Sequence, residues 1–302
     1  MTVLKWLGGV VLLLIVAGVG LGFASRWEIV GTMNVLDRLW SGARGERVAE
    51  GVAYGSDPIQ RVDVYAPSGD TTDDMKPVVI WFHGGGWNNG GRRQYAFAGR
   101  AFSGEGFVTV VVGYRLAEAG KFPLFMEDAA AAIRWTHANI ARYGGDPERI
   151  VLAGHSAGGH IAALAALDRQ WLGALAGPGG AIKGVVGIAG AYDFLPFKPD
   201  GSAQKYLGHV RPLSRTQPVT YVRGDAPPML LLWGDADTLV YRRNIESLTA
   251  RQRAAGGVVE SKIYPGVDHS EIVMGLSRPF RDRAPVLADA VAFARGVTAE
   301  AP

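Results

Sequence analysis

The clearest candidate for a catalytic residue in the sequence is a serine between small residues. Residues 154–158 read GHSAG and stand between the apolar stretch IVLA and the alanine-rich stretch AGGHIAALAAL. A buried strand that passes directly into a helix must turn sharply. The glycines remove steric conflict around the turn while the serine hydroxyl stays accessible. The context therefore predicts that Ser156 is a nucleophile.

Three consecutive glycines follow another apolar stretch and offer backbone donors. Residues 83–87 read HGGGW, directly after VVIWF. When a nucleophile attacks a carbonyl group, negative charge develops on its oxygen, and a preorganised N–H donor to that oxygen is worth about 3–4 kcal/mol. We predict that Gly85, Gly86 and the backbone N–H of Ala157 form this oxyanion hole, and that His83 shapes the loop.

A serine hydroxyl needs a base, which in turn needs a carboxylate to orient it. Where a serine occupies such a strand-to-helix turn, the acid and then the histidine follow it in the chain. Four of the 6 histidines are thereby excluded, because three precede Ser156 and His160 lies on the helix directly after it. His209 and His269 remain. Only His269 lies beyond the acidic loop described next, so we predict that His269 is the base.

The acid is expected in the loop GDADTLV, which follows the apolar stretch MLLLW. Asp237 stands just before a Leu-Val pair that would anchor the loop, and we predict that it orients the histidine. Asp235 is directly next to the strand end, where an aspartate commonly holds a turn through its own side chain. It stays open as the alternative.

Alternating strands and helices must position these residues. Short apolar runs that end near glycine are typical of buried parallel strands. The predicted strands are 60–66 (antiparallel, at an edge), 78–82, 108–112, 150–153, 185–189, 229–233 and 260–264, and the clearest helices are 126–143 and 157–168. This pattern predicts an α/β fold with a mostly parallel central sheet and helices on both faces. The proline-rich residues 192–228 are interpreted as a connection over the active face.

The N-terminal segment has a different character. Residues 6–24 carry no charge and are flanked by Lys5 and Arg26, and such a run is long enough to cross a bilayer core of about 30 Å. We expect residues 1–25 to form a hydrophobic helix that anchors the protein to a membrane, with a cleaved signal peptide and an exported protein as the alternative. Residues 26–48 are then a linker, and 49–302 the catalytic domain.

Composition excludes several classes of protein. The 31 Lys and Arg residues nearly balance 28 Asp and Glu residues and are dispersed, so no nucleic-acid-binding surface is expected. The absence of Cys excludes disulfides, thiolate metal sites and a cysteine nucleophile. A hydrophobic content of 48% excludes a disordered chain.

Taken in order, these motifs resemble the α/β-hydrolase superfamily, and more narrowly its bacterial carboxylesterase and hormone-sensitive-lipase-like group, close to BD-FAE-like proteins. The resemblance rests on PVVIWFHGGGW, GHSAGGHIAAL, DAPPMLLLWGDADTLV and YPGVDHSEI. It implies a Ser156–Asp237–His269 triad with the oxyanion donors named above. It also implies hydrolysis of small-molecule carboxylic esters, with short acyl or aryl groups, through an acyl-enzyme without cofactor or metal.

Other functions share these motifs. A kynurenine-formamidase-like hydrolase would cleave an aryl formamide or amide with the same triad. A membrane-associated lipase would use the N-terminal segment and prefer long-chain lipids. A non-catalytic binding module of the same fold is the alternative from another class, although such modules usually lack a member of the triad.

Overall fold

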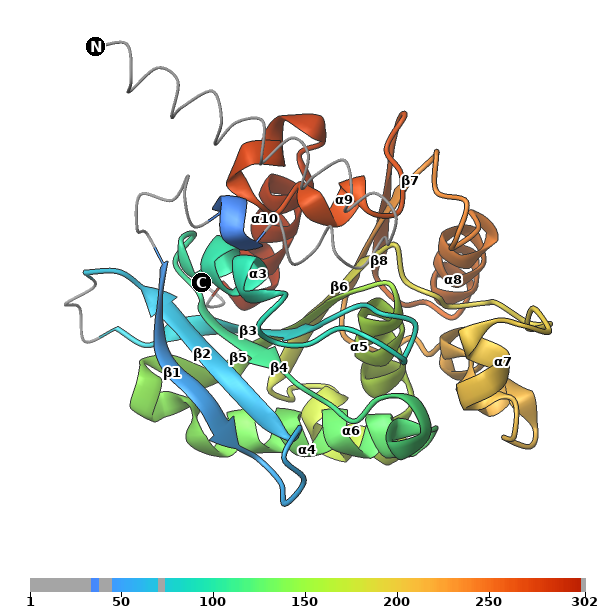
Figure 1. The fold of residues 1–302 in the computed structure, drawn as a ribbon, viewed down its shortest axis with the longest axis horizontal. Coiled ribbons are helices and arrows are strands. Elements are labelled where there is room, and N and C mark those ends of the chain that lie inside the picture. The colour runs from blue at the N-terminus through green and yellow to red at the C-terminus, as the bar shows by residue number, and fades with distance from the viewer. Residues whose placement is uncertain (1–33, 38–44, 70–73, 300–302) are drawn as a thin grey trace, which may run out of the picture.

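The computed structural model describes residues 34–37, 45–69 and 74–299, which form one sheet with helices on both sides (Figure 1). The sheet has the strand order β1-β2-β4-β3-β5-β6-β7-β8. Its strands are β1 (Gly45–Ala53), β2 (Arg61–Pro67), β3 (Lys76–Phe82), β4 (Val108–Val112), β5 (Gly145–His155), β6 (Ile182–Ile188), β7 (Met229–Gly234) and β8 (Val259–Tyr264). β1 and β2 are antiparallel to their neighbours, and the strands from β4 to β8 run parallel.

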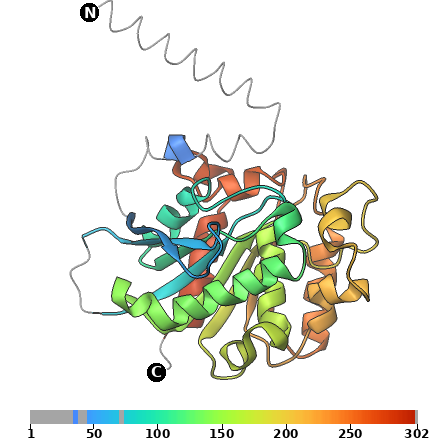
Figure 2. The ribbon, with the colours of Figure 1, turned by 60° about the horizontal axis from the view of Figure 1, so that its bottom comes forward.

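Helices cover both faces of this sheet. They are α3 (Ala96–Ser103), α4 (Leu124–Asn139), α5 (Ala157–Leu167), α6 (Arg169–Leu172), α7 (Ser202–Leu207), α8 (Arg243–Ala254), α9 (Glu271–Met274) and α10 (Val286–Thr298). Helices α3 and α10 contact each other on one face, and α4 and α5 contact each other on the opposite face (Figure 2). The predicted α/β architecture is thereby confirmed.

The central strands are buried because each has helices on both sides. All five residues of β4, VTVVV, are buried, as are Val78 to Phe82 of β3. Such strands must be apolar on both faces, which gives continuous apolar runs rather than alternation. That is the reason why their positions could be predicted from the sequence.

The N-terminal edge of the sheet was not predicted. β1 begins at Gly45, inside the stretch 26–48 that the sequence assigned to a linker, and its residues GERVAEGVA are mostly exposed or half-buried. An edge strand with solvent on one side needs no apolar run. Within that same stretch, Asp37 is buried and forms an ion pair of 2.7 Å with Arg100 of α3.

The expected membrane helix at residues 1–25 lies outside the described residues. Among the helices of the described ranges, none combines the length and hydropathy needed to cross a bilayer.

Parallel strands bring their following loops to one edge. The loops after β3, β5, β7 and β8 carry the glycine run, the serine, the acidic loop and His269, respectively. Ligand sites in open α/β sheets lie at the carboxyl ends of the strands. The topology therefore gathers the predicted functional residues at one end of the sheet.

Candidate active site

Ser156 lies on the turn between β5 and α5 and has strained backbone geometry. Its φ is +55° and its ψ −119°, a region that costs a non-glycine residue about 1–3 kcal/mol. The turn is held because the Ser156 N–H donates to the Ile188 carbonyl of β6 at 2.8 Å. A Cβ on Gly158 would stand 2.0 Å from the carbonyl oxygen of Phe82, so the helix can approach β3 only with glycine there.

A hydrogen-bonded chain links the three residues predicted to form the triad. His269 Nδ1 lies 2.7 Å from Asp237 Oδ2, and His269 Nε2 lies 2.9 Å from Ser156 Oγ. A carboxylate only accepts, so Nδ1–H donates to Asp237, which leaves Nε2 free to accept the serine hydroxyl proton. This is the tautomer in which a histidine can act as a base towards serine.

The loop that carries Asp237 fixes its carboxylate. The side chain is fully buried, while that of His269 is 12% exposed. The second oxygen, Oδ1, accepts the backbone N–H groups of Leu239 at 2.8 Å and Val240 at 2.9 Å. These two donors leave Oδ2 for His269, so the Leu-Val pair anchors the loop through its backbone.

Asp235 and His209, the alternatives that the sequence left for the acid and the base, lie elsewhere. Asp235 accepts the N–H of Gly266 at 2.6 Å, so it holds the turn that leads to His269. His209 donates through Nε2 to the carbonyl of Phe122 at 2.7 Å. The geometry therefore joins Asp237, and not Asp235, to the histidine.

The predicted oxyanion donors divide into two groups. Gly86 and Ala157 line the cavity above Ser156, and neither amide donates a hydrogen bond to another described residue. Gly85 is not part of the cavity lining, and its carbonyl accepts the N–H groups of Asn88 at 3.0 Å and Asn89 at 2.9 Å, which turns the chain there. A Cβ at Gly85 would stand 1.7 Å from the Asn89 carbonyl oxygen.

His83 supports this loop, as the sequence led us to expect. Its Nδ1–H donates to the Gly84 carbonyl at 2.8 Å, and its ring stacks on Tyr114 with centroids 4.2 Å apart. The Tyr114 hydroxyl donates to the His83 carbonyl at 2.7 Å. Burial lowers the pKa of His83 to about 4, so the ring is neutral at pH 7.

His155 is a part of the site that sequence reasoning missed. Its Nε2–H donates to the backbone carbonyl of His269 at 2.9 Å, and its Nδ1 faces the Tyr95 hydroxyl at 3.3 Å. The rings of His155 and His269 are 4.8 Å apart. Burial holds the pKa of His155 well below its usual range. A neutral His155 thus fixes the backbone of His269 without placing a second positive charge beside it.

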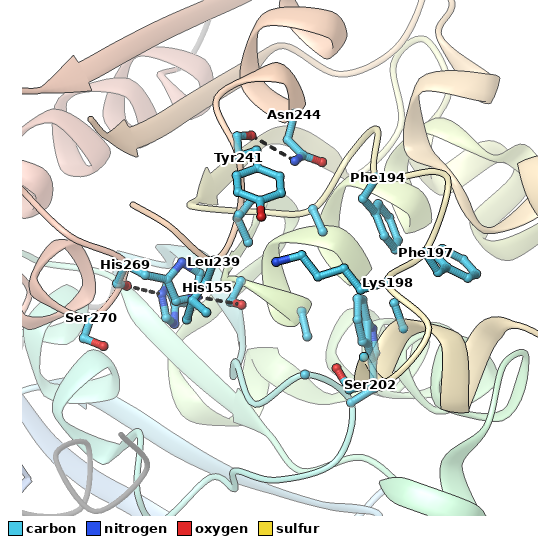
Figure 3. Close-up of a pocket in the computed structure, with 18 of the residues that line it drawn as sticks. His155, Phe194, Phe197, Lys198, Ser202, Leu239, Tyr241, Asn244, His269 and Ser270 are labelled. Carbon is cyan, nitrogen blue, oxygen red and sulfur yellow. Dashed lines mark hydrogen bonds between the residues drawn. The ribbon is translucent and has the colours of Figure 1, made fainter. Parts of the chain in front are cut away.

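Ser156 and His269 line a cavity of about 480 Å³, and Figure 3 shows His269 among the side chains around it. Residues 191–203, which follow β6 and run into the start of α7, form one wall, and the loop from β7 into α8, with Leu239 and Tyr241, forms another. Trp87 stacks on Phe194 at 5.8 Å between ring centroids, and Phe194 contacts Phe197 at 5.4 Å. The predicted connection over the active face therefore contributes aromatic side chains to one side of the cavity.

Side chains of α8 hold this wall in place. Asn244 Oδ1 accepts the backbone N–H groups of Tyr192 at 2.8 Å and Asp193 at 2.9 Å. The Ser247 hydroxyl donates to the Asp193 carboxylate at 2.6 Å. The guanidinium of Arg243 donates to the carbonyls of Asp193 and Leu195. The cavity is thus shaped by contacts between α8 and the segment after β6, which are distant in sequence.

The arrangement contains the parts needed for nucleophilic catalysis: a serine with a base, an oriented carboxylate, and backbone N–H groups beside the serine. In residues 34–37, 45–69 and 74–299, no group of three or more His, Asp or Glu side chains is placed to hold a metal ion.

Relatives of known name match most of the chain. It is 33% identical to esterase LipC of Mycobacterium tuberculosis over 72% of its length, and 30% identical to a probable isoprenylcysteine alpha-carbonyl methylesterase of Oryza sativa subsp. japonica over 76%. The chain spans 58% of the length of each of these curated relatives.

Solved structures share the fold. Esterase B of Lactobacillus rhamnosis, in complex with a tributyrin phosphonate, matches with a TM-score of 0.75 and 20% identity, over 94% of this chain and 95% of that one. Thermogutta terrifontis esterase 2 phosphorylated by paraoxon matches with a TM-score of 0.67 and 23% identity, over 85% of this chain and 97% of that one. At such low identities these matches show the fold alone.

A family model described as BD-FAE matches residues 62–251. The match includes Ser156 and Asp237 and ends before His269. Because it covers well over half of the chain, the resemblance inferred from the motifs is confirmed, and the chain belongs to the BD-FAE family.

Proposed function

We propose that the protein is a serine esterase that hydrolyses carboxylic esters with short acyl or aryl groups through an acyl-enzyme. The observation that carries the proposal is the hydrogen-bonded chain from Ser156 through His269 to Asp237 beneath a largely apolar cavity. The names of the relatives, an esterase and a probable methylesterase, also favour ester bonds over the formamide and lipid alternatives.

In the acylation step, Ser156 Oγ attacks the ester carbonyl carbon while His269 Nε2 takes the hydroxyl proton. Asp237 keeps the other imidazole proton on Nδ1 and stabilises the imidazolium that forms. The N–H groups of Gly86 and Ala157, with that of Gly85 as the third predicted donor, stabilise the oxyanion. When the tetrahedral intermediate collapses, His269 gives its proton to the departing alcohol, and the acyl group stays on Ser156.

Deacylation repeats the route with water. His269 takes a proton from the water as its oxygen attacks the acyl carbon, and the same N–H groups stabilise the second oxyanion. The carbonyl then reforms, the bond to Ser156 Oγ breaks, and His269 returns the proton to the serine. The products are a carboxylic acid and a regenerated hydroxyl.

A fluorophosphonate probe tests the nucleophile directly. The wild type is expected to be labelled and to hydrolyse 4-nitrophenyl acetate, whereas Ser156→Ala is expected to lose labelling and about 10⁶ in kcat. Ser261→Ala, on the edge strand β8, is the matched control and should retain both. Labelling that survives in Ser156→Ala would contradict the assignment, and turnover of an aryl formamide without any ester would contradict the reaction.

We also propose that residues 1–25 attach this enzyme to a membrane. The support is the uncharged run at 6–24 between Lys5 and Arg26. Membrane fractionation of the full chain, followed by an intact mass, tests it. Membrane-bound protein that retains residues 1–25 is expected. Exported protein in the soluble fraction, with a mass that lacks them, would instead support a cleaved signal peptide.

A further inference from the structure

A lysine lies in the mouth of the cavity and has no anionic partner. Lys198 follows Phe197 on the wall formed by residues 191–203, and its ammonium extends into the cavity towards Tyr241 (Figure 3). Its Nζ is 4.7 Å from the centroid of the Tyr241 ring. Within the part of the chain that the structure describes, Lys198 forms no ion pair, so its charge faces the cavity uncompensated.

Arg243, the first residue of α8, adds a second cation to the cavity lining. Its guanidinium donates to the backbone carbonyls of Asp193 and Leu195, which are neutral acceptors and leave its charge in place. Among the described residues that line the cavity, there is no Asp or Glu. Asp237 is buried behind His269 and engaged by it, and the Asp193 carboxylate is held by the Ser247 hydroxyl. The side chains that line the cavity therefore include two cations and no carboxylate, and Asp193 and Asp200 of the same segment are not among them.

The remainder of the cavity is suited to apolar groups. Trp87, Phe194 and Phe197 form a continuous aromatic side, and Leu239 and Val273 add aliphatic surface. A ligand complementary to both features has an apolar body and a negative charge at one end, because the anion would be attracted by the cationic wall while the apolar part leaves water.

We propose that this cavity selects esters that carry a carboxylate, such as half-esters of dicarboxylic acids, and that Lys198 recognises the anion. The inference rests on the proposed esterase function and adds its substrate class. Lys198 acts on specificity alone, because its ammonium contacts the charged end of the substrate while Ser156 and His269 carry out the reaction.

Matched pairs of esters test the inference on the full chain. One pair is monomethyl adipate and methyl hexanoate, which places the anion on the acyl side. The other is 4-acetoxybenzoate and methyl 4-acetoxybenzoate, which places it on the alcohol side. The measured quantity is the ratio of kcat/KM for the anionic ester to that for its neutral partner. In at least one pair, we expect this ratio to fall about fivefold in Lys198→Met, which is the size of a good exposed ion pair.

Three further measurements distinguish an effect of the Lys198 charge from an effect on the structure of the cavity. Lys198→Arg should keep the ratio, Lys198→Glu should lower it further than Lys198→Met, and salt at about 1 M should lower it in the wild type. The matched control is Lys205→Met: Lys205 is exposed on α7, with its Nζ 5.3 Å from the Tyr206 ring, and is not part of the cavity lining. Its ratio should equal that of the wild type.

The outcomes distinguish the two proposals. Hydrolysis of the neutral esters with the same ratio in the wild type and Lys198→Met, in both pairs, would overturn the substrate class and leave the esterase function standing. A ratio that falls equally in Lys205→Met would also overturn it, because the effect would then come from overall charge. Absence of hydrolysis of all four esters would overturn the esterase function itself.

Discussion

At the scale of single residues, the acidic loop offers a sharp comparison between two aspartates. Asp237 accepts the Nδ1–H of His269, whereas Asp235 accepts a backbone N–H of the following turn. We predict that Asp237→Asn lowers kcat by about 10⁴, because an amide stabilises the wrong histidine tautomer and cannot stabilise the imidazolium. Steady-state hydrolysis of 4-nitrophenyl acetate measures this.

Asp235→Asn is the matched control, since its amide oxygen can still accept the Gly266 N–H. We expect its kcat to stay within about threefold of the wild type, because a single exposed hydrogen bond contributes little. A collapse of activity in Asp235→Asn alone would show that the structure pairs the wrong carboxylate with His269.

Much of this chemistry could be predicted from the order of residues along the chain. Ser156 was found from its flanking strand and helix, and His269 by elimination. His155 was set aside because it precedes the serine, yet it donates to the carbonyl of His269. That contact joins residues 114 positions apart, so no local pattern reveals it. The same holds for Lys198, because its place in the cavity lining, beside Tyr241, depends on how two distant segments pack together.

At the scale of elements, the packing of α5 against β3 sets the position of Ser156. Gly158 leaves no room for a Cβ, which would meet the Phe82 and His83 carbonyl oxygens at 2.0 and 2.7 Å. We predict that Gly158→Ala lowers the free energy of unfolding by about 3 kcal/mol, because backbone must shift to admit the methyl group. Urea unfolding followed by circular dichroism measures this change.

Gly296→Ala in α10 is the control for glycine replacement in a helix. The added Cβ would meet no heavy atom within 4 Å, so the better helix propensity of alanine should stabilise the protein by about 0.5–1 kcal/mol. Equal effects of the two substitutions would mean that the close contact at Gly158 does not constrain the turn between β5 and α5.

The elements themselves were predictable to different degrees. The buried parts of strands β3 to β7 are apolar on both faces and stand out in the sequence, whereas β1 is exposed or half-buried and does not. The segment between β6 and β7 could be predicted only as a connection that passes over the active face. Its shape depends on Asn244 and Arg243 of α8, which bind its backbone from a distant part of the chain.

At the scale of the whole molecule, three buried histidines make the free energy of unfolding depend on pH. His83, His155 and His160 lie in the core around the site, and His160 donates to the carbonyl of Thr216. Burial lowers the pKa of His83 and His160 to about 4, and that of His155 well below its usual range. All three are therefore neutral in the folded protein at pH values where an unfolded chain would protonate them.

The sign of the effect follows from proton binding. Between about pH 6.5 and pH 4 the unfolded chain binds more protons than the folded one. The contribution of these histidines to the free energy of unfolding is therefore fully present above pH 6.5 and is lost as the pH falls. The loss is up to about 1.4 kcal/mol per pH unit for each histidine. Burial raises the pKa of Asp63, which opposes this trend only at the acidic end.

Urea unfolding at pH values from 7 to 4.5 measures the slope, and His160→Gln tests its origin. A glutamine amide can still donate to Thr216 but cannot take up a proton, so the variant should bind about one proton fewer on unfolding and show a correspondingly shallower loss of stability. A wild-type stability that stays flat between pH 6.5 and 5 would contradict the prediction, because buried neutral histidines require the unfolded state to gain protons over that range.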